Sequence, residues 1–193
     1  MPSKPAQSRS SRKTSSSRSS KSSRSTKKGS KASPRRASAA KAAAPARPYV
    51  VRRSAIHGRG VFAACTIRKG ADIIEYRGQR ITMKEADRRP DSDPDNPYHT
   101  FLFELDDGRV IDAAVRGNAA RWINHSCAPN CEPYEDDEGR VFIAAKRTIR
   151  KGEELGYDYR LNVDGRVTRE MREAYTCRCG APRCRGTMLG KKR

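Results

Sequence analysis

The segment RWINHSCAPNC, which runs from Arg121 to Cys131, decides how this sequence is interpreted. Two apolar residues lead directly into Asn124, His125 and a serine, followed by Cys127, a proline, an asparagine and a second cysteine. So many polar and thiol groups on one short segment raise the question of what they bind. The other cysteines of the chain supply the first answer.

The cysteines predict a metal site rather than a set of disulfides. The chain has six of them, at positions 65, 127, 131, 177, 179 and 184. Nothing indicates secretion, and Cys177 and Cys179 are too close together to join distant parts of the chain. Together with Cys184 they follow the pattern C-x-C-x4-C and supply three of the four ligands of a tetrahedral zinc site. The fourth must come from one of the other three cysteines or from a histidine; the alternative is a group of reduced surface thiols.

A cysteine hydrolase is a rival interpretation of the same segment. Cys127 and His125 are a candidate nucleophile and base, but residues two apart on a turn usually point in different directions. No third group that would orient the histidine is evident. The remaining histidines, His57 and His99, are more simply explained as hydrogen-bonded structural residues. The metal interpretation is therefore preferred.

The first 48 residues differ in composition from the rest of the chain. They contain 15 Ser and 14 Lys or Arg, with no acidic and no aromatic residue. Such a segment cannot bury enough apolar surface to offset the entropy of ordering, so residues 1–48 are predicted to be disordered. The formal net charge is +20. Because 14 of the 42 basic residues lie in this tail and all 22 acidic residues follow it, the rest of the chain carries only +6.

This basic tail is expected to bind DNA or RNA without sequence preference, because contacts with phosphates release counterions. A solvated linker is the alternative, since a run of charge specifies no partner. The sequence has no apolar run of about 18 residues, and its N-terminus lacks the apolar core of a secretory signal. We therefore expect an intracellular protein with no membrane segment, located in a nucleus or on a chromosome, or in a bacterial cytoplasm or nucleoid. Export as an effector is a further alternative.

From Tyr49 onward, short strands and turns predict a mainly β fold of the α+β class. Alternating apolar residues on both sides of Asp107 and Gly108 predict a β-hairpin, and residues 135–149 predict a second one. Short helices are expected in three places: after the cap Thr82, from Asn118, and over residues 167–175.

Two further patterns concern turns and aromatic residues. The sequence TIRKG occurs at residues 66–70 and again at 148–152, and we interpret it as one glycine turn used twice rather than a duplicated domain. The sequence GYDY predicts a strand with Tyr157 and Tyr159 on one face and Asp158 on the other. Half-buried structural aromatics are the simpler explanation for these tyrosines when they are considered alone.

Four motifs together resemble a known family. They are HGRGVFA (57–63), GNAARWINHSCAPNC (117–131), GEELGYDY (152–159) and CRCGAPRC (177–184). Their order and approximate separations are similar to those of SET-domain protein lysine methyltransferases with a zinc-binding post-SET segment. The resemblance covers Tyr49 to about Gly186. It implies three parts: the tail (1–48), a SET domain (49–166) and a post-SET segment (167–193). It also implies small curved β-sheets in which the NHS segment and the C-terminal chain form a pseudoknot.

The resemblance also assigns roles to individual residues. S-adenosylmethionine is expected to be bound by His57, Gly58, Arg59, Gly60, Phe101, Arg121, Asn124, His125 and Arg178. The zinc ligands would be Cys127, Cys177, Cys179 and Cys184. Tyr159 matches the catalytic tyrosine, and Tyr157 occupies the position where members of the family carry Phe or Tyr. Phe101 departs from the pattern, because a tyrosine that contacts the cofactor is common there.

These assignments imply methylation of a lysine in a histone or in another basic, nucleic-acid-associated protein. A tyrosine at 157 leaves less room than a phenylalanine, so mono- and dimethylation are expected over trimethylation. Acidic residues at 132–138 and 91–95 either line a groove for a basic peptide or are solvated turns. Lysines of the tail, such as Lys13 and Lys31, are candidate substrates. The alternative from another class is a non-enzymatic, zinc-stapled protein that binds nucleic acid through its tail.

Overall fold

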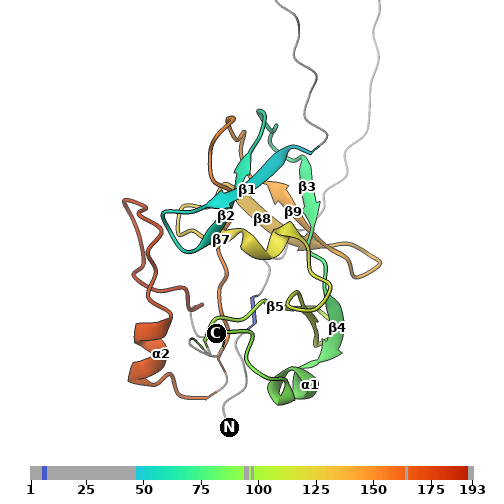
Figure 1. The fold of residues 1–193 in the computed structure, drawn as a ribbon, viewed down its shortest axis with the longest axis vertical. Coiled ribbons are helices and arrows are strands. Elements are labelled where there is room, and N and C mark those ends of the chain that lie inside the picture. Colours follow the sequence, from blue (N-terminus) through green and yellow to red (C-terminus); the bar gives the residue numbers. More distant parts are fainter. Residues whose placement is uncertain (1–5, 8–46, 94–95, 97, 164, 191–193) are drawn as a thin grey trace, which may run out of the picture.

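The computed structural model describes residues 6–7, 47–93, 96, 98–163 and 165–190. The predicted disorder of residues 1–48 therefore lies largely outside the described residues. The expectation of a mainly β fold with short helices is confirmed (Figure 1). None of the described helices has the length and apolar character needed to cross a membrane.

The elements follow one another in short steps along the chain. The strands are β1 (Tyr49–Arg53), β2 (Arg59–Ala63), β3 (Asp72–Glu75), β4 (Gln79–Thr82), β5 (Leu102–Glu104), β6 (Arg109–Asp112), β7 (Asn124–His125), β8 (Cys131–Glu135), β9 (Val141–Ala145) and β10 (Gly156–Tyr157). The helices are α1 (Met83–Arg88), the 3₁₀ helix η1 (Ala119–Trp122) and α2 (Arg169–Ala174).

These strands form four small sheets. Three are antiparallel, with the orders β1-β2, β3-β9-β8 and β4-β6-β5. The fourth is the parallel pair β7 and β10, in which Asn124 faces Gly156 and His125 faces Tyr157. A parallel pair requires a long crossover, and here the intervening chain forms the β8–β9 hairpin. The NHS segment is thereby placed directly beside the GYDY segment.

Local sequence signals explain the ends of most elements. The Thr82 side chain accepts a hydrogen bond from the Glu85 amide and begins α1, and Asn118 and Thr168 cap η1 and α2 in the same way. Gly108 closes the β5–β6 hairpin at φ +79°, a conformation that costs glycine nothing. The predicted cap at Thr82, the three predicted short helices and both predicted hairpins are confirmed.

The repeated TIRKG segments are also turns, as predicted. Gly70 and Gly152 both have positive φ, at +82° and +89°. The two copies are moreover partners in space: Ile67 and Ile149 exchange both backbone hydrogen bonds at 2.9 Å. Each copy therefore satisfies backbone groups of the other.

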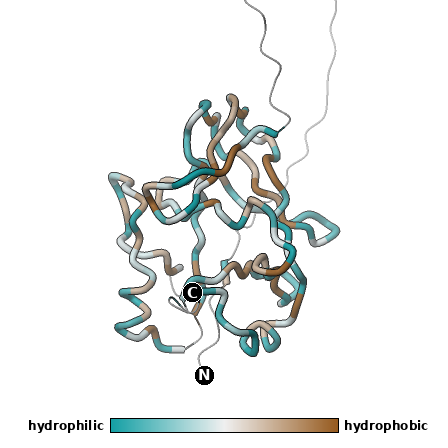
Figure 2. The backbone as a smooth tube through the Cα atoms, in the orientation of Figure 1, coloured by the Kyte–Doolittle hydropathy of each residue, from teal (hydrophilic) through white to brown (hydrophobic). Residues whose placement is uncertain are grey.

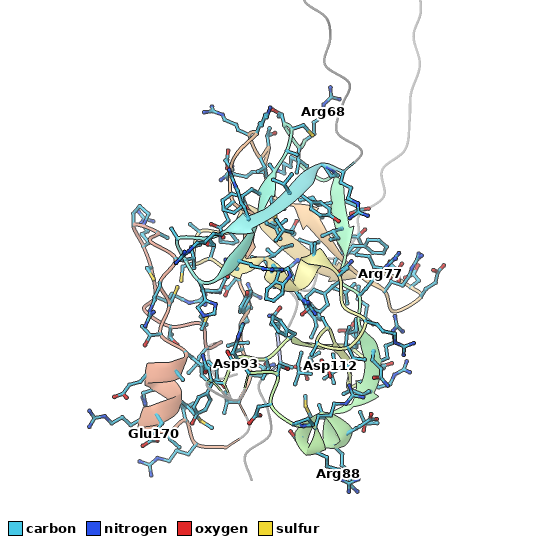
Figure 3. All side chains as sticks on the ribbon, in the orientation of Figure 1. Arg68, Arg77, Arg88, Asp93, Asp112 and Glu170 are labelled. Carbon is cyan, nitrogen blue, oxygen red and sulfur yellow. The ribbon has the colours of Figure 1, made fainter. Side chains whose placement is uncertain are left out.

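The main core lies among the strands and includes fully buried Val61, Ile143, Ile149, Leu155 and Tyr157. Figure 2 shows hydrophobic stretches along the strands and a hydrophilic turn between β8 and β9. The charged side chains mostly project outward. Figure 3 labels Arg68, Arg77, Arg88 and Glu170 at the outline of the molecule, whereas Asp112 lies inside it and forms a 2.6 Å ion pair with Arg89.

The GYDY segment differs from its prediction in one respect. The strand β10 ends at Tyr157, so Tyr159 is not on it. Asp158 turns toward the C-terminal segment and binds the Arg185 guanidinium at 2.6 and 2.8 Å. Two residues further on, Arg160 has a positive φ of +47°. The two tyrosine rings still adjoin, with centroids 5.0 Å apart.

Two residues of the tail are part of the fold, contrary to the predicted disorder. Ala6 forms an antiparallel bridge with Asn162, and Gln7 forms a parallel bridge with Phe103 of β5. Figure 1 shows this short blue stretch beside β5. Both residues are buried, with 2% and 4% of their surfaces exposed. They connect β5 with the chain that follows the tyrosines.

Candidate active site

The first wall of the site is the turn that carries the HGRG motif. The side-chain amide of Asn124 donates hydrogen bonds to the Arg59 carbonyl (3.0 Å) and to the Glu154 carboxylate (2.8 Å). Gly58 lies at φ +44°, and a Cβ at Gly60 would collide with Glu154. The absence of a side chain at Gly60 therefore leaves room for the Glu154 carboxylate that Asn124 binds.

Beside this turn lies a cavity of about 250 Å³. One wall is a chain of rings: the His57 ring lies 5.0 Å from His99, which lies 4.9 Å from Phe101, which lies 5.2 Å from Trp122. The pKa of His57 is lowered by burial and by the charges of His99 and Arg178. The His57 ring is therefore neutral at neutral pH and adds no charge to this wall.

Arg121 brings an unused donor to the same cavity. Its guanidinium donates one hydrogen bond to the Ala113 carbonyl and lies 4.6 Å from the centre of the Trp122 ring. Its Nε is buried and has no hydrogen-bond partner among the described residues. A buried donor without an acceptor is costly, so a ligand that brings an acceptor is expected to bind here.

Tyr159 also lines this cavity. Its hydroxyl donates to the Ile123 carbonyl at 2.6 Å, and its backbone amide donates to His125 Nδ1 at 3.2 Å. Burial, with the nearby Glu154 charge, raises the pKa of Tyr159 well above its ordinary value. The phenol therefore remains protonated and acts as a fixed hydrogen-bond donor.

Tyr157 lies deeper and is fully buried. Its hydroxyl donates to Gln7 Oε1. Burial raises its pKa well above the usual range, and neighbouring Tyr76 and Tyr159 act in the same direction. Tyr76 is a third buried phenol, and it donates to the Phe101 carbonyl at 3.0 Å. Three protonated tyrosines thus gather where Gln7 enters.

His125 links the tyrosines to the cysteines. Contrary to the expectation that His125 and Cys127 point apart, His125 Nε2 lies 3.4 Å from Cys127 Sγ. His125 Nδ1, however, accepts the Tyr159 amide proton, so Nε2 of the neutral ring carries the hydrogen. Burial lowers the pKa of His125 to about 4, although Asp158 opposes this. A ring in this tautomer cannot take a proton from the thiol, so the hydrolase alternative lacks its base.

Four cysteine side chains converge beside His125. The sulfurs of Cys127, Cys177, Cys179 and Cys184 all lie within 4.8 Å of one another. Each accepts a backbone amide hydrogen bond at 3.4 Å, for example Cys127 from Arg185 and Cys179 from Cys127. Amide donors stabilise thiolates, and four thiolates at this separation are a donor set for tetrahedral zinc. The cluster therefore fits a structural zinc ion that would connect residue 127 to the C-terminal segment.

A family profile described as the SET domain matches residues 58–160, which is more than half of the chain. The chain belongs to the SET-domain family. Its relatives include histone-lysine N-methyltransferase trr of Drosophila melanogaster (42% identical over 139 residues) and histone-lysine N-methyltransferase 2B of Homo sapiens (41% over 138 residues). Each alignment covers 70% of this chain but only 6% and 5% of the relative, so the chain spans a small part of these proteins.

The fold brings most of the residues singled out in the sequence to one place, from the SET domain and from the segment that follows it. Eight of the nine residues expected at the cofactor line the cavity: His57, Gly58, Arg59, Phe101, Arg121, Asn124, His125 and Arg178. The ninth, Gly60, packs against Glu154 instead. Of the remaining cysteines, Cys131 is buried in the core and Cys65 lies outside the four-sulfur cluster.

Several residues of the SET site were not found from the sequence. Trp122 and His99 line the cavity, and Tyr76 joins the other two buried tyrosines. Aromatic residues at isolated positions carry no periodic signal that would reveal this. In the acidic turn, Asp136 binds Arg140 at 2.8 Å and accepts hydrogen bonds from the amides of Glu138 and Arg140, so this residue stabilises the turn.

Proposed function

We propose that this chain is an S-adenosylmethionine-dependent protein-lysine N-methyltransferase that acts on a histone or another basic, nucleic-acid-associated protein. The main observation behind the proposal is that one cavity is lined by Tyr159, by the HGRG turn and by Arg121, whose Nε has no hydrogen-bond partner among the described residues. The names of the relatives, which are histone-lysine N-methyltransferases, support the same chemistry. They also support a chromatin location.

The cavity residues suit S-adenosylmethionine. Arg121 and Arg178 offer cationic groups for its carboxylate, and Asn124 holds the glycine turn close to the site. The ring wall that includes Phe101 and Trp122 offers flat apolar faces for an adenine. When bound, the cofactor would supply a methyl group activated by a sulfonium centre.

The protein must present the substrate lysine as a neutral amine. At its ordinary pKa of about 10.4, loss of the proton costs about 4.6 kcal/mol at pH 7. Buried Tyr76 and Tyr157 and partly buried Tyr159 are proposed to wall a narrow channel, which would disfavour the ammonium form because burial lowers a lysine pKa. The channel needs no strong base. Aromatic walls also tolerate a methylated cation after transfer.

Two hydroxyls would position the amine in this channel. Tyr159, anchored on the Ile123 carbonyl, orients the incoming nitrogen, so that alignment and exclusion of water supply most of the rate. Tyr157 adds a second polar contact and occupies space that further methyl groups would need. We therefore propose mono- and dimethylation over trimethylation for this chain, although a relative from Arabidopsis thaliana is named histone H3-lysine(4) N-trimethyltransferase ATX1.

The basic tail is proposed to bring the enzyme to nucleic acid. It carries 14 basic residues and no acidic one, which suits phosphate contacts without base readout. The four cysteines are proposed to hold zinc, which would fix the C-terminal segment against Cys127. Zinc would act as a structural ion here, because all four of its positions are filled by sulfur.

Radiolabelled methyl transfer onto a panel of histones and bacterial nucleoid proteins tests the activity. Calorimetric titration with S-adenosylmethionine tests the cavity independently of the substrate. A zinc-stapled nucleic-acid-binding protein without enzymatic activity would retain its zinc but neither bind the cofactor nor transfer label. Mass spectrometry of the chain incubated alone with cofactor determines whether tail lysines such as Lys13 or Lys31 are substrates.

A further inference from the structure

Ala6 and Gln7 lie in the structure as a bound peptide would. The Gln7 amide donates to the Leu102 carbonyl at 3.1 Å, and the Gln7 carbonyl accepts from the Glu104 amide at 2.8 Å. On the other side, the Ala6 carbonyl accepts from Asn162 at 3.4 Å. This is β-strand addition between two existing edges, which holds a peptide mainly through its backbone. Backbone pairing by itself does not select a sequence, so any preference must come from the side-chain pockets.

The Gln7 side chain enters the site described above. It lines the cavity together with Tyr159, and its Oε1 accepts a hydrogen bond from the fully buried Tyr157. A side chain that leaves an extended segment and reaches the buried tyrosines follows the path that the target lysine of the proposed function needs. Glutamine is one atom shorter than lysine, and its amide nitrogen has no free lone pair for attack on a methyl group.

The residue before it lies in a closed apolar pocket. Ala6 packs in a buried cluster with Ile81, Ala86, Leu102 and Val110. Only 2% of the surface of Ala6 is exposed, so a larger side chain at this position would displace its neighbours or leave the groove. The cluster therefore selects a small residue immediately before the one that enters the channel.

We propose that Ala6–Gln7 is a pseudosubstrate: it occupies the groove for the substrate peptide, places an unreactive glutamine where the target lysine enters, and identifies the preferred substrate as a lysine that follows a small residue. This inference rests on the proposed methyltransferase function. Since the segment is tethered to the enzyme, its local concentration is high, and an external peptide must compete with it. The chain is therefore restrained until a partner or substrate displaces the segment.

Changing the glutamine to lysine tests the identity of the channel. The full-length Gln7→Lys variant, incubated with S-adenosylmethionine, is expected to gain methyl groups at residue 7, at a rate that does not depend on protein concentration. Gln7→Arg, which is also cationic but is not a substrate, is the matched control and should gain none there. Tandem mass spectrometry locates the modification. If the Gln7→Lys variant methylates histones but not residue 7, the assignment of the channel is overturned.

Removing the segment from the groove tests the restraint. Ala6→Trp does not fit the small pocket and is expected to lower the apparent KM for a histone peptide about tenfold. Ala32→Trp makes the same change elsewhere in the tail and should leave KM unchanged. The KM of a peptide with Ala immediately before the lysine should also be about tenfold lower than the KM of the same peptide with Leu at that position. Equal KM values for the two tryptophan variants would overturn the pseudosubstrate role.

Hydrogen exchange separates failure of this inference from failure of the proposed function. The Glu104 amide, which donates to Gln7, should exchange slowly in the wild-type chain and faster in Ala6→Trp, whether or not any methyl is transferred. If no variant methylates any protein but this difference appears, the proposed function fails and the occupied groove stands. If methylation occurs and Glu104 exchanges equally fast in both chains, the groove is not occupied by this segment.

Discussion

The Tyr159 hydroxyl donates to the backbone carbonyl of Ile123, with 2.6 Å between the two oxygens. The bond joins two segments that are 36 residues apart in the sequence. It fixes the phenol at the cavity wall and leaves its ring against His125, with centroids 5.3 Å apart. The phenol is therefore held in position before any substrate arrives.

Replacement of Tyr159 by phenylalanine is expected to lower methyl transfer about 100-fold or more, because one preorganised hydroxyl is lost at the reacting centre. Radiolabelled transfer onto histones measures the effect. Tyr134→Phe is the control, since that hydroxyl binds Asp72 at 2.9 Å on the outside of β8. Equal rates in the two variants would remove Tyr159 from the mechanism.

Replacement of Tyr157 by phenylalanine should change the product rather than the rate. Loss of this hydroxyl frees space and removes one polar contact in the channel, so the trimethylated fraction is expected to rise. Mass spectrometry of the methylated peptide over a time course separates the three products. An unchanged product distribution would show that Tyr157 does not set the degree of methylation.

Loss of one cysteine of the cluster should destabilise the whole C-terminal segment. We expect one zinc per chain in the wild type, measured by atomic absorption, and none in Cys184→Ser. The melting temperature should fall by about 10 °C or more, because metal binding contributes directly to folding. Cys65→Ser, outside the cluster, should retain both the metal and the melting temperature. Equal zinc content in the two variants would contradict the assignment.

Binding of duplex DNA should depend on the tail and on salt. With 14 basic residues before Tyr49, the full chain is expected to bind DNA at about 50 mM salt and to lose most of its affinity, on the order of 1,000-fold, by about 200 mM. A chain that begins at Tyr49 should bind weakly at both concentrations. Fluorescence anisotropy with two unrelated sequences checks this. A strong preference for either sequence would argue against purely phosphate-based binding.

The parts of the fold that were predictable depend on near neighbours in the sequence. The hairpin at Gly108 and the cap at Thr82 are set by residues within a few positions, so their signals can be read directly. The end of β10 was not predictable in this way: the residue that follows it, Asp158, pairs with Arg185, which is 27 residues away in the sequence. The prediction of the fold class rests on many local signals, so an error at the end of one strand does not change it.

The candidate site was predictable where motifs carry it and not where isolated residues do. The HGRG and NHSC motifs identified five of the residues that line the cavity, whereas Trp122 and Tyr76 stand outside any spacing rule. The docking of Ala6 and Gln7 against the folded part was the least predictable feature of the site. Composition assigns the tail to disorder. The pairing of Gln7 with Phe103 of β5, and of Ala6 with Asn162 further along the chain, leaves no trace in an average over 48 residues.

Two long-range contacts determine when the protein can bind a ligand in its cavity. They are the parallel pairing of β7 with β10 and the approach of Cys127 to three cysteines far along the chain. A ribosome releases the residues in order, so Cys177 and Arg178, which line the cavity, emerge after the HGRG turn, the ring wall and the tyrosines. The glycine turn, the ring wall and the tyrosines can therefore collapse early around an incomplete pocket. Affinity for a ligand of the cavity should therefore appear late in biosynthesis, together with binding of the proposed zinc ion.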